Sequence, residues 1–464
     1  MKRQSFETLT LEKIVGGGQA LGTLADGRKC FVWGGLPGET VTVRITKKKS
    51  HLVEAVVEEV ILPSPDRIQP RDPDSYLSTS PWQIMPLELE QTYKAQLIDD
   101  AFTLHDVTLP GTIEVYCDNV AYGYRNKVEF SWYSEAGKHG DTLDLAFFRR
   151  GSKGKIVVNG TSLARPEINN LARAIRDLLH HKHTSARQLK TLLIRCDQSG
   201  SCVWQLYLKD RSSEIITAGE AATLPAQGGE IIYSDPRSPA SRITERLAHF
   251  GNTTLTDTVL GVPFRYACEG FFQVNIPVYE QALHDMRKWV SRESSYWQLG
   301  HHQKIIRDPR KVAQIFSEVP LAADQPILDF YAGVGTIGLT IASGNVTLVE
   351  INADAVREMQ RNITELGHTN ACAVLAPSEQ ALDHITGREI VIVDPPRAGL
   401  HPDVIATLLQ QLPPRILYLS CNPVTQARDV ALLQQRYHIA WHRGYNFFPR
   451  TPHSEHLVVL DKIS

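Results

Sequence analysis

One stretch decides the fold of the C-terminal part of the chain: Ile327-Leu328-Asp329-Phe330-Tyr331-Ala332-Gly333-Val334-Gly335-Thr336-Ile337-Gly338. A short apolar run leads into a glycine-rich turn, and the turn opens an apolar helix. Glycine lets the backbone turn tightly, so that a nucleotide can approach it closely beside a helix N-terminus. Glu350 ends the next apolar run, where a carboxylate can accept hydrogen bonds from ribose hydroxyls. The segment predicts a site for a nucleoside-bearing cofactor.

Two cofactors fit this turn. Gly333, Gly335 and Gly338 match the dinucleotide fingerprint GxGxxG, which indicates an NAD-dependent oxidoreductase. Asp329 upstream of the turn favours S-adenosylmethionine, whose sites commonly place an acid four residues before the first glycine. A purely structural glycine turn is the third interpretation.

The residues after the turn alternate between apolar runs and amphipathic segments. We expect strands at 346–350, 389–393 and 415–419, and helices at 354–366 and 403–412. Such alternation is typical of a mostly parallel sheet covered by helices.

The first 62 residues have the pattern of a small all-β unit, in which glycine turns separate runs of strand length. Four prolines follow within residues 63–73 and can hold neither a helix nor a central strand, so we predict a linker over 63–86. An amphipathic helix is predicted at 87–104, where it can pack on the C-terminal part. The other predicted boundaries are a central region over 87–260 and a C-terminal domain over 261–464.

The central region is basic although the whole chain has a formal net charge of −2. Between residues 125 and 195, 14 Lys and Arg stand against 6 acids, a local net charge of +8. Aromatic residues are interleaved with them. The pattern fits either a β-rich region with a solvated charged face or a surface that binds phosphates and stacks bases. The candidate contacts are Arg125, Lys127, Arg149 and Arg150.

The composition excludes several classes of protein. No apolar run is long enough to span a membrane, and the N-terminus lacks the apolar run of a signal peptide. The seven cysteines are scattered, with no CxxC pair, so neither a disulfide framework nor a zinc ribbon is expected. We therefore expect a cytoplasmic protein. The expected oligomeric state is a monomer.

Two further motifs follow predicted strands. Asp394-Pro395-Pro396-Arg397 places an acid in a rigid turn at the carboxyl end of a strand, where open α/β sheets bind ligands. Cys421 lies in a polar Ser-Cys-Asn-Pro turn after another strand. A lone cysteine is commonly a buried hydrophobe, but here Arg428 and the next helix N-terminus are available to favour a thiolate.

Glu455 stands at the head of a final strand, between His453 and His456. The two histidines lack a third ligand, so no metal is expected. A cysteine, a carboxylate and a sulfonium cofactor together suit one reaction. A thiolate that adds to uracil C6 makes C5 nucleophilic, C5 takes a methyl group, and a base then removes the C5 proton so that the cysteine leaves.

The chain resembles the RNA uracil-C5 methyltransferases, which make 5-methyluridine in bacterial tRNA and 23S ribosomal RNA. The matching motifs are residues 329–338, 394–399, 420–423 and 452–456, with Gly270-Phe271-Phe272-Gln273-Val274-Asn275 before the catalytic domain. Residues 1–62 look like the family's TRAM module, an RNA-binding β-barrel of OB type. The resemblance implies a Rossmann-like class I methyltransferase domain, the small N-terminal β-barrel and a β-rich central RNA-binding region.

The resemblance also implies roles for residues. Cys421 would be the nucleophile and Glu455 the base that removes the C5 proton. S-adenosylmethionine would be held by Gln273, Tyr331, Gly333, Gly335, Thr336, Glu350 and Asp394, and Asp394 would also touch the uracil. Arg397 joins the candidate RNA contacts. The TRAM-like module favours 23S ribosomal RNA over tRNA as the partner.

The chain departs from the family pattern at three places. Residues 71–83 and 151–167 lack the cysteines of the iron–sulfur cluster found in many members, so no cluster is expected. Thr336 stands where some relatives have Asn. Residues 290–325 form a long polar connection for which the sequence gives no account. The competing interpretations are a tRNA uridine-C5 methyltransferase, an NAD-dependent oxidoreductase and a catalytically silent RNA-binding protein; the joint presence of Cys421 and Glu455 argues against the last.

Overall fold

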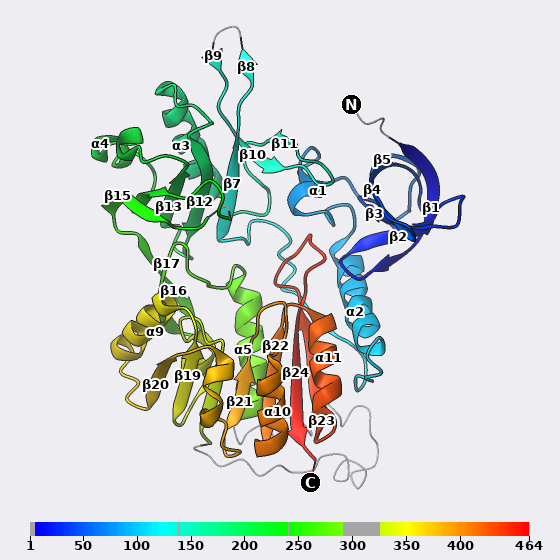
Figure 1. The fold of residues 1–464 in the computed structure, drawn as a ribbon, viewed down its shortest axis with the longest axis vertical. Helices are drawn as coiled ribbons and strands as arrows, with labels where there is room; N and C mark the ends of the chain where they lie inside the picture. Colours follow the sequence, from blue (N-terminus) through cyan, green and yellow to red (C-terminus); the bar gives the residue numbers. More distant parts are fainter. Residues whose placement is uncertain (1–4, 138–139, 240, 291–324, 464) are drawn as a thin grey trace.

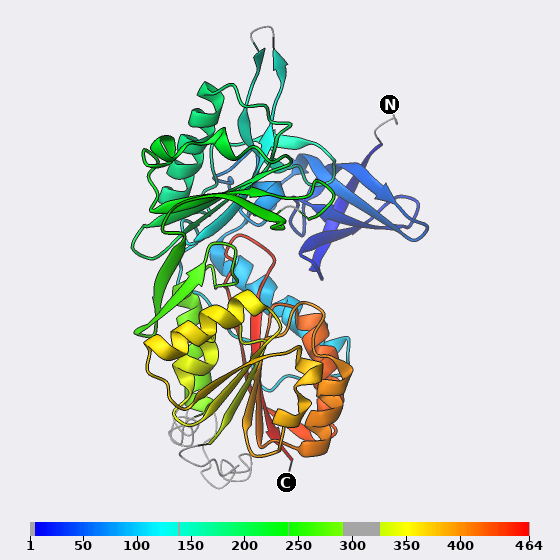
Figure 2. The same cartoon turned by 60° about the vertical axis from the view of Figure 1, so that its left-hand side comes forward.

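The computed structural model describes residues 5–137, 140–239, 241–290 and 325–463. The connection predicted at 290–325 therefore lies almost entirely outside the described residues. The chain forms a closed barrel, a central sheet and a larger C-terminal sheet; in Figures 1 and 2 the barrel lies beside the central sheet, and the C-terminal sheet lies below them. No helix among the described residues is long and apolar enough to cross a membrane.

The N-terminal strands close into a barrel in the order β1-β2-β3-β5-β4. Buried and exposed residues alternate along them, as a barrel with a filled interior requires. The strands are β1 Phe6–Val15, β2 Gln19–Thr23, β3 Lys29–Trp33, β4 Thr40–Lys48 and β5 Leu52–Leu62. This confirms the expected small N-terminal β-barrel.

The proline-rich stretch after the barrel contains one helical turn, α1 (Tyr76–Thr79), and then packs under the barrel. Trp82, Ile84 and Met85 are buried in the barrel's own apolar cluster. The Trp82 indole N–H donates to the Gly18 carbonyl at 3.0 Å. The segment predicted as a linker thus fixes the barrel to the rest of the chain.

The central region is a seven-stranded sheet in the order β11-β10-β7-β12-β13-β14-β15. Its one long helix among the described residues, α3 (Pro166–His181), packs its apolar face on the sheet. The β-rich character of the region was expected, whereas this helix was not. The strands are β7 Lys127–Tyr133, β10 Asp144–Phe148, β11 Lys155–Val157, β12 Leu189–Cys196, β13 Cys202–Leu208, β14 Gly228–Tyr233 and β15 Glu245–Gly251. The smaller elements are β8 Ala136–Gly137, β9 Gly140–Asp141, η1 Ser213–Ile215 and α4 Ala218–Ala221.

A hairpin of β16 (Thr254–Val259) and β17 (Val262–Ala267) leads to an eight-stranded sheet in the order β20-β19-β18-β21-β22-β24-β23-β6. The strands from β20 to β22 are parallel, whereas β24 runs antiparallel between β22 and β23. The strands are β18 Ile327–Phe330, β19 Val346–Glu350, β20 Ala371–Leu375, β21 Ile390–Val393, β22 Arg415–Ser420, β23 Tyr437–Tyr445, β24 Glu455–Lys462 and β6 Val115–Tyr116. The strands and helices predicted over 327–419 all form.

Helices cover both faces of this sheet, as the predicted α/β class requires. One face carries α5 (Ile276–Val290), α8 (Thr336–Ile341) and α9 (Ala353–Glu365). The other carries α10 (Pro402–Gln411), α11 (Pro423–Leu433) and α2 (Leu87–Thr103). Two 3-10 turns, η2 (Ser378–Gln380) and η3 (Leu382–His384), follow β20. The helix predicted at 87–104 therefore packs on the C-terminal sheet, and its neighbour β6 extends that sheet at the edge.

Candidate active site

Two parallel strands and one antiparallel strand bring the chemically active residues together where the parallel strands end. Residue Ser420 at the end of β22 pairs with His456 near the start of β24, so Cys421 and Glu455 leave the two strands side by side. Asp394 follows β21, the next strand along. All three line a cavity of about 1010 Å³.

The glycine turn forms one wall of this cavity. Gly333 and Gly335 have φ of 58° and 88°, in the left-handed region that favours glycine. The Glu350 carboxylate accepts the Gly333 N–H at 3.0 Å and the Asn352 N–H at 2.7 Å. The sharp turn is thus tied to the end of β19.

Asp329 lies beneath the turn and is fully buried. Its Oδ2 accepts the Gly338 N–H at 2.9 Å, while its Oδ1 has no hydrogen-bond partner. Burial raises the pKa of this carboxyl to about 8. A Cβ on Gly338 would lie 2.5 Å from Leu348, so this glycine allows the close packing of helix on strand.

The predicted cofactor residues divide into two groups. Gln273, Tyr331, Gly333, Glu350 and Asp394 line the cavity. Thr336 and Gly335 do not. Thr336 is buried at the start of α8, and the Gly335 position packs against Leu339 and Met359. Gly335 and Thr336 therefore support the turn from the protein interior and do not face the cavity.

Cys421 is partly buried, and the pKa of its thiol is raised to about 11. Burial is the main cause, and the nearby Glu455 and Asp394 carboxylates add to it, whereas Arg397 acts in the opposite direction. The predicted role of Arg428 is wrong. Its Nη2 contacts Asp429 at 2.7 Å and the Ala398 carbonyl at 3.0 Å. Arg397 is the cation beside the thiol.

Glu455 and Asp394 form an acidic pair at the cavity floor. Burial and the Asp394 charge raise the pKa of Glu455 well above its usual range. Burial raises the pKa of Asp394 to about 7. Because like charges in a desolvated site disfavour each other's ionised form, the pair retains a proton near neutral pH.

His453 lines the same cavity beside Arg397, and Arg397 Nη2 lies 3.3 Å from His453 Nδ1. Burial and the neighbouring Arg397 charge lower the pKa of His453 to about 4, so the ring is neutral. A guanidinium only donates, so Nδ1 accepts and the proton sits on Nε2. His453 therefore presents a fixed N–H donor.

The predicted RNA contacts do not share one surface. Arg125, Arg150 and Arg397 line the cavity, and Arg149 is exposed outside it. Lys127 points inward, where its Nζ donates to the Glu269 carbonyl at 3.1 Å and burial lowers its pKa to about 8. As a candidate RNA contact it is therefore wrongly placed.

Arg195, counted in the basic stretch, is fully buried and donates to the carbonyls of Gly270 and Phe272. It holds the segment that carries Gln273. The local charge of +8 thus overstates the cationic surface.

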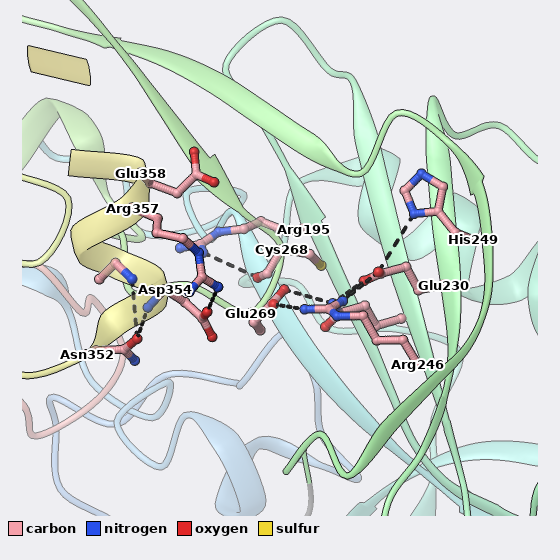
Figure 3. A network of polar contacts seen from close by, with 12 residues as sticks. Arg195, Glu230, Arg246, His249, Cys268, Glu269, Asn352, Asp354, Arg357 and Glu358 are labelled. Carbon is pink, nitrogen blue, oxygen red and sulfur yellow. Dashed lines mark hydrogen bonds and ion pairs between the residues drawn. The ribbon is translucent and has the colours of Figure 1, made fainter. Parts of the chain in front are cut away.

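The cavity wall also contains side chains that were not expected there, among them Arg246, Arg357 and Phe271. Arg246 binds Glu230 and Glu269, and Arg357 binds Asp354, so each charge is already balanced by carboxylates (Figure 3). Phe271 is 68% exposed, a flat apolar surface beside the cavity. Phe271 lies in the quoted motif before Gln273, whereas Arg246 and Arg357 lie outside every motif, and no sequence signal marks them.

Among the residues that the structure describes, no group of three or more His, Cys, Asp or Glu side chains is arranged to hold a metal ion.

Residues 310–463 match the model of the tRNA (uracil-5-)-methyltransferase family. A protein from Nitratidesulfovibrio vulgaris described as an uncharacterized RNA methyltransferase is 26% identical and covers 97% of this chain and 95% of its own length. A protein of the same description from Lactobacillus johnsonii is 25% identical, with 94% of each chain covered. Over residues 310–463 the chain is thus similar to the tRNA (uracil-5-)-methyltransferase family, and over nearly its whole length it is similar to proteins described as RNA methyltransferases. These matches indicate an RNA (uracil-5-)-methyltransferase, and they favour S-adenosylmethionine over NAD as the cofactor of the glycine turn.

The fold of this RNA methyltransferase is shared by a solved structure. The tRNA (uracil-54, C5)-methyltransferase of Pyrococcus abyssi, solved in complex with S-adenosyl-L-homocysteine, superposes with a TM-score of 0.71 at 20% identity. The match covers 97% of this chain and 100% of the other. The likeness extends over the barrel and the central sheet as well as the methyltransferase domain.

Proposed function

We propose that the protein methylates C5 of a uridine in structured RNA, with S-adenosylmethionine as methyl donor, through a covalent bond between Cys421 and C6 of the base. One observation carries the proposal: the β22–β24 register sets Cys421 beside Glu455 at the cavity floor, with Asp394 on the adjacent strand. A nucleophile and a base on neighbouring strands can act on adjacent carbons of one ring.

The residues around the glycine turn fit the methyl donor. The Gly333 position has no heavy atom within 4 Å of a built Cβ, and Asp329 keeps a buried carboxylate oxygen without a partner. Glu350 has lone pairs left to accept ribose hydroxyls beyond its two backbone contacts. Gln273, Tyr331, Glu350 and Asp394 would hold the donor. When bound, it supplies an electrophilic methyl group and a positive charge.

The protein's own residues account for the remaining chemistry. The Cys421 thiol gives up its proton to solvent water in the open cavity, and the nearby Arg397 charge favours the thiolate. The thiolate sulfur then bonds C6, and the electron pair of the C5–C6 double bond moves into the ring enolate, which makes C5 nucleophilic. After C5 is methylated, Glu455 takes the C5 proton while Asp394 carries the proton that the pair retains. The electron pair of the C5–H bond forms the C5–C6 double bond, the S–C6 bond breaks, and its electron pair returns to sulfur. Asp394, with its pKa near neutrality, can donate or accept a hydrogen bond at the uracil edge.

The RNA would approach across the cavity wall formed by Arg125, Arg150 and Arg397. Arg150 also stacks on Trp33 of the barrel at 4.1 Å, so the barrel borders the same approach. The methyl donor must reach C5 from one face of the uracil ring, and the Cys421 sulfur must reach C6 from the other face. Both faces are accessible only if the uridine flips out of its base stack. We propose 23S ribosomal RNA as the target on account of the barrel. The description of the matched family and the Pyrococcus abyssi enzyme favour tRNA as the second candidate.

The test uses 23S ribosomal RNA fragments and tRNA that contain 5-fluorouridine, incubated with S-adenosylmethionine and run on a denaturing gel. Fluorine cannot leave C5 as a proton, so the thiolate adduct is trapped. We expect a shifted band that Cys421→Ala abolishes and that the matched control Cys372→Ala, at an exposed cysteine, retains. A band that survives in Cys421→Ala would refute the proposed nucleophile, and the RNA that gives the band identifies the target.

A further inference from the structure

A buried ion pair on α2 lies outside the set of residues that line the cavity. Glu90 and Lys94 are both fully buried, and Lys94 Nζ lies 2.8 Å from Glu90 Oε1. Removing two charges from water costs more than their mutual attraction returns unless further hydrogen bonds satisfy them. The hydrogen-bond partners of Glu90 and Lys94 therefore indicate which part of the structure the pair stabilises.

Both members of the pair bind the segment Asn446–Arg450. Lys94 Nζ donates to Asn446 Oδ1 at 2.5 Å and to the Phe448 carbonyl at 3.1 Å. Glu90 Oε1 accepts from Asn446 Nδ2 at 2.9 Å, and its Oε2 accepts the Arg450 N–H at 2.9 Å. The pair thus fixes one side chain and two backbone groups of a single segment.

This segment leads directly to Glu455. Strand β23 ends at Tyr445 and β24 begins at Glu455, so residues 446–454 form the loop that rises from the edge of the sheet toward the central region (Figure 1). Arg450 has φ of 66°, an unfavourable conformation for a residue with a side chain. Its Nη1 donates to the Met85 carbonyl at 2.6 Å, which helps to hold that conformation.

The barrel touches the same loop from the other side. A Cβ on Gly18, in the turn between β1 and β2, would lie 2.0 Å from Pro452 Cβ. Trp82 ties the two together, because its indole donates to the Gly18 carbonyl and its backbone N–H donates to the Arg450 carbonyl at 3.1 Å. The loop before Glu455 is thus held by contacts with α2 on one side and with the barrel on the other.

We propose that Glu90 and Lys94 are positioning residues, which hold loop 446–454 so that the Glu455 carboxylate meets the C5 proton of the methylated base. This inference rests on the proposed function of Cys421 and Glu455. The ion pair touches no reacting atom. Its loss would slow the release of the product, which needs Glu455, more than the formation of the adduct, which needs Cys421.

The experiment measures two rates with unmodified RNA and S-adenosylmethionine: formation of the denaturant-stable protein–RNA adduct, and release of methylated RNA. Glu90→Gln leaves Lys94 without a carboxylate. A misplaced catalytic group costs on the order of 10²-fold, so we expect release to slow by about that factor, with adduct formation within about threefold of the wild type. The adduct then accumulates.

A charge-preserving exchange provides the rescue. In the double variant Glu90→Gln with Asn446→Asp, the glutamine amide can donate to the new carboxylate, its oxygen can accept the Arg450 N–H, and Lys94 regains a counter-charge. We expect release to recover. Gly18→Ala is the second route, because it presses on Pro452 from the barrel without touching the ion pair; it too should raise the fraction of trapped adduct.

The matched control is Asp461→Asn. Asp461 forms a buried ion pair with Arg415, at 2.6 Å, between β22 and β24. These strands also position Cys421 and Glu455, but the Asp461–Arg415 pair lies at their opposite end. We expect it to leave the ratio of the two rates unchanged. The proposal is overturned if Glu90→Gln and Gly18→Ala slow both rates in equal proportion, or if the exchange variant fails to restore release. A wild type that gives no adduct even with 5-fluorouridine RNA would instead overturn the proposed function.

Discussion

Asp394→Asn is expected to stabilise the protein at alkaline pH while it abolishes methyl transfer. Asp394 stands at the cavity floor beside Glu455, and burial raises its pKa from 3.8 to about 7. Between those values the folded protein binds more protons than the unfolded chain does. The free energy of unfolding therefore falls as the pH rises through this window.

The size of the effect follows from the shift. About three pKa units at ~1.36 kcal/mol each give a ceiling of ~4 kcal/mol. The side chain is partly exposed, so solvent screening reduces this to about 2 kcal/mol. Asparagine keeps the shape and carries no charge, so the variant escapes this cost. We expect it to exceed the wild type by about 2 kcal/mol at pH 8 and to equal it near pH 4.

Urea unfolding followed by tryptophan fluorescence at pH 5 and pH 8 measures this difference. Asp99→Asn, at an exposed carboxylate on α2, is the matched control and should change stability equally at both pH values. The reasoning is refuted if Asp394→Asn shows the same difference from the wild type at pH 5 as at pH 8. It is also refuted if the variant keeps wild-type methylation.

Three other substitutions test separate parts of the site. Gly335→Ala should lower the free energy of unfolding by about 1–3 kcal/mol, because φ is 88° and the new Cβ would lie 2.9 Å from Leu339 Cδ1. Urea unfolding measures the loss, and an unchanged midpoint contradicts the prediction. Glu350→Gln should weaken S-adenosylmethionine binding about tenfold by calorimetry, because one acceptor oxygen becomes a donor facing the Gly333 or Asn352 N–H. Arg150→Met should lower the slope of log RNA affinity against log salt by about one, whereas Arg173→Met on α3 should leave it unchanged; equal slopes would remove Arg150 from the RNA interface.

The sequence alone was sufficient where local pattern decides the structure. The glycine turn and the strands at 327–330 and 346–350, which contain Asp329 and Glu350, formed as expected, because turn chemistry and apolar runs act over a few residues. Cys421 and Glu455 were placed at strand ends for the same reason. Strand β20 was missed, since its alanines and part-exposed residues give a weak strand signal, and so was β6, a two-residue edge strand.

Other features depended on contacts between distant parts of the chain. The cation beside Cys421 is Arg397 and not Arg428, and Lys127 turns inward, because burial and partners depend on how the sheets meet. Lys94 reaches Asn446 across 352 residues of sequence. Local pattern was enough to propose Cys421, Glu455 and the glycine turn as the candidate site, since each lies in its own turn or strand end. The charges that face the cavity and the Glu90–Lys94 pair beneath loop 446–454 emerged only from the folded chain, because a buried ion pair exists only where folding removes water from both of its members.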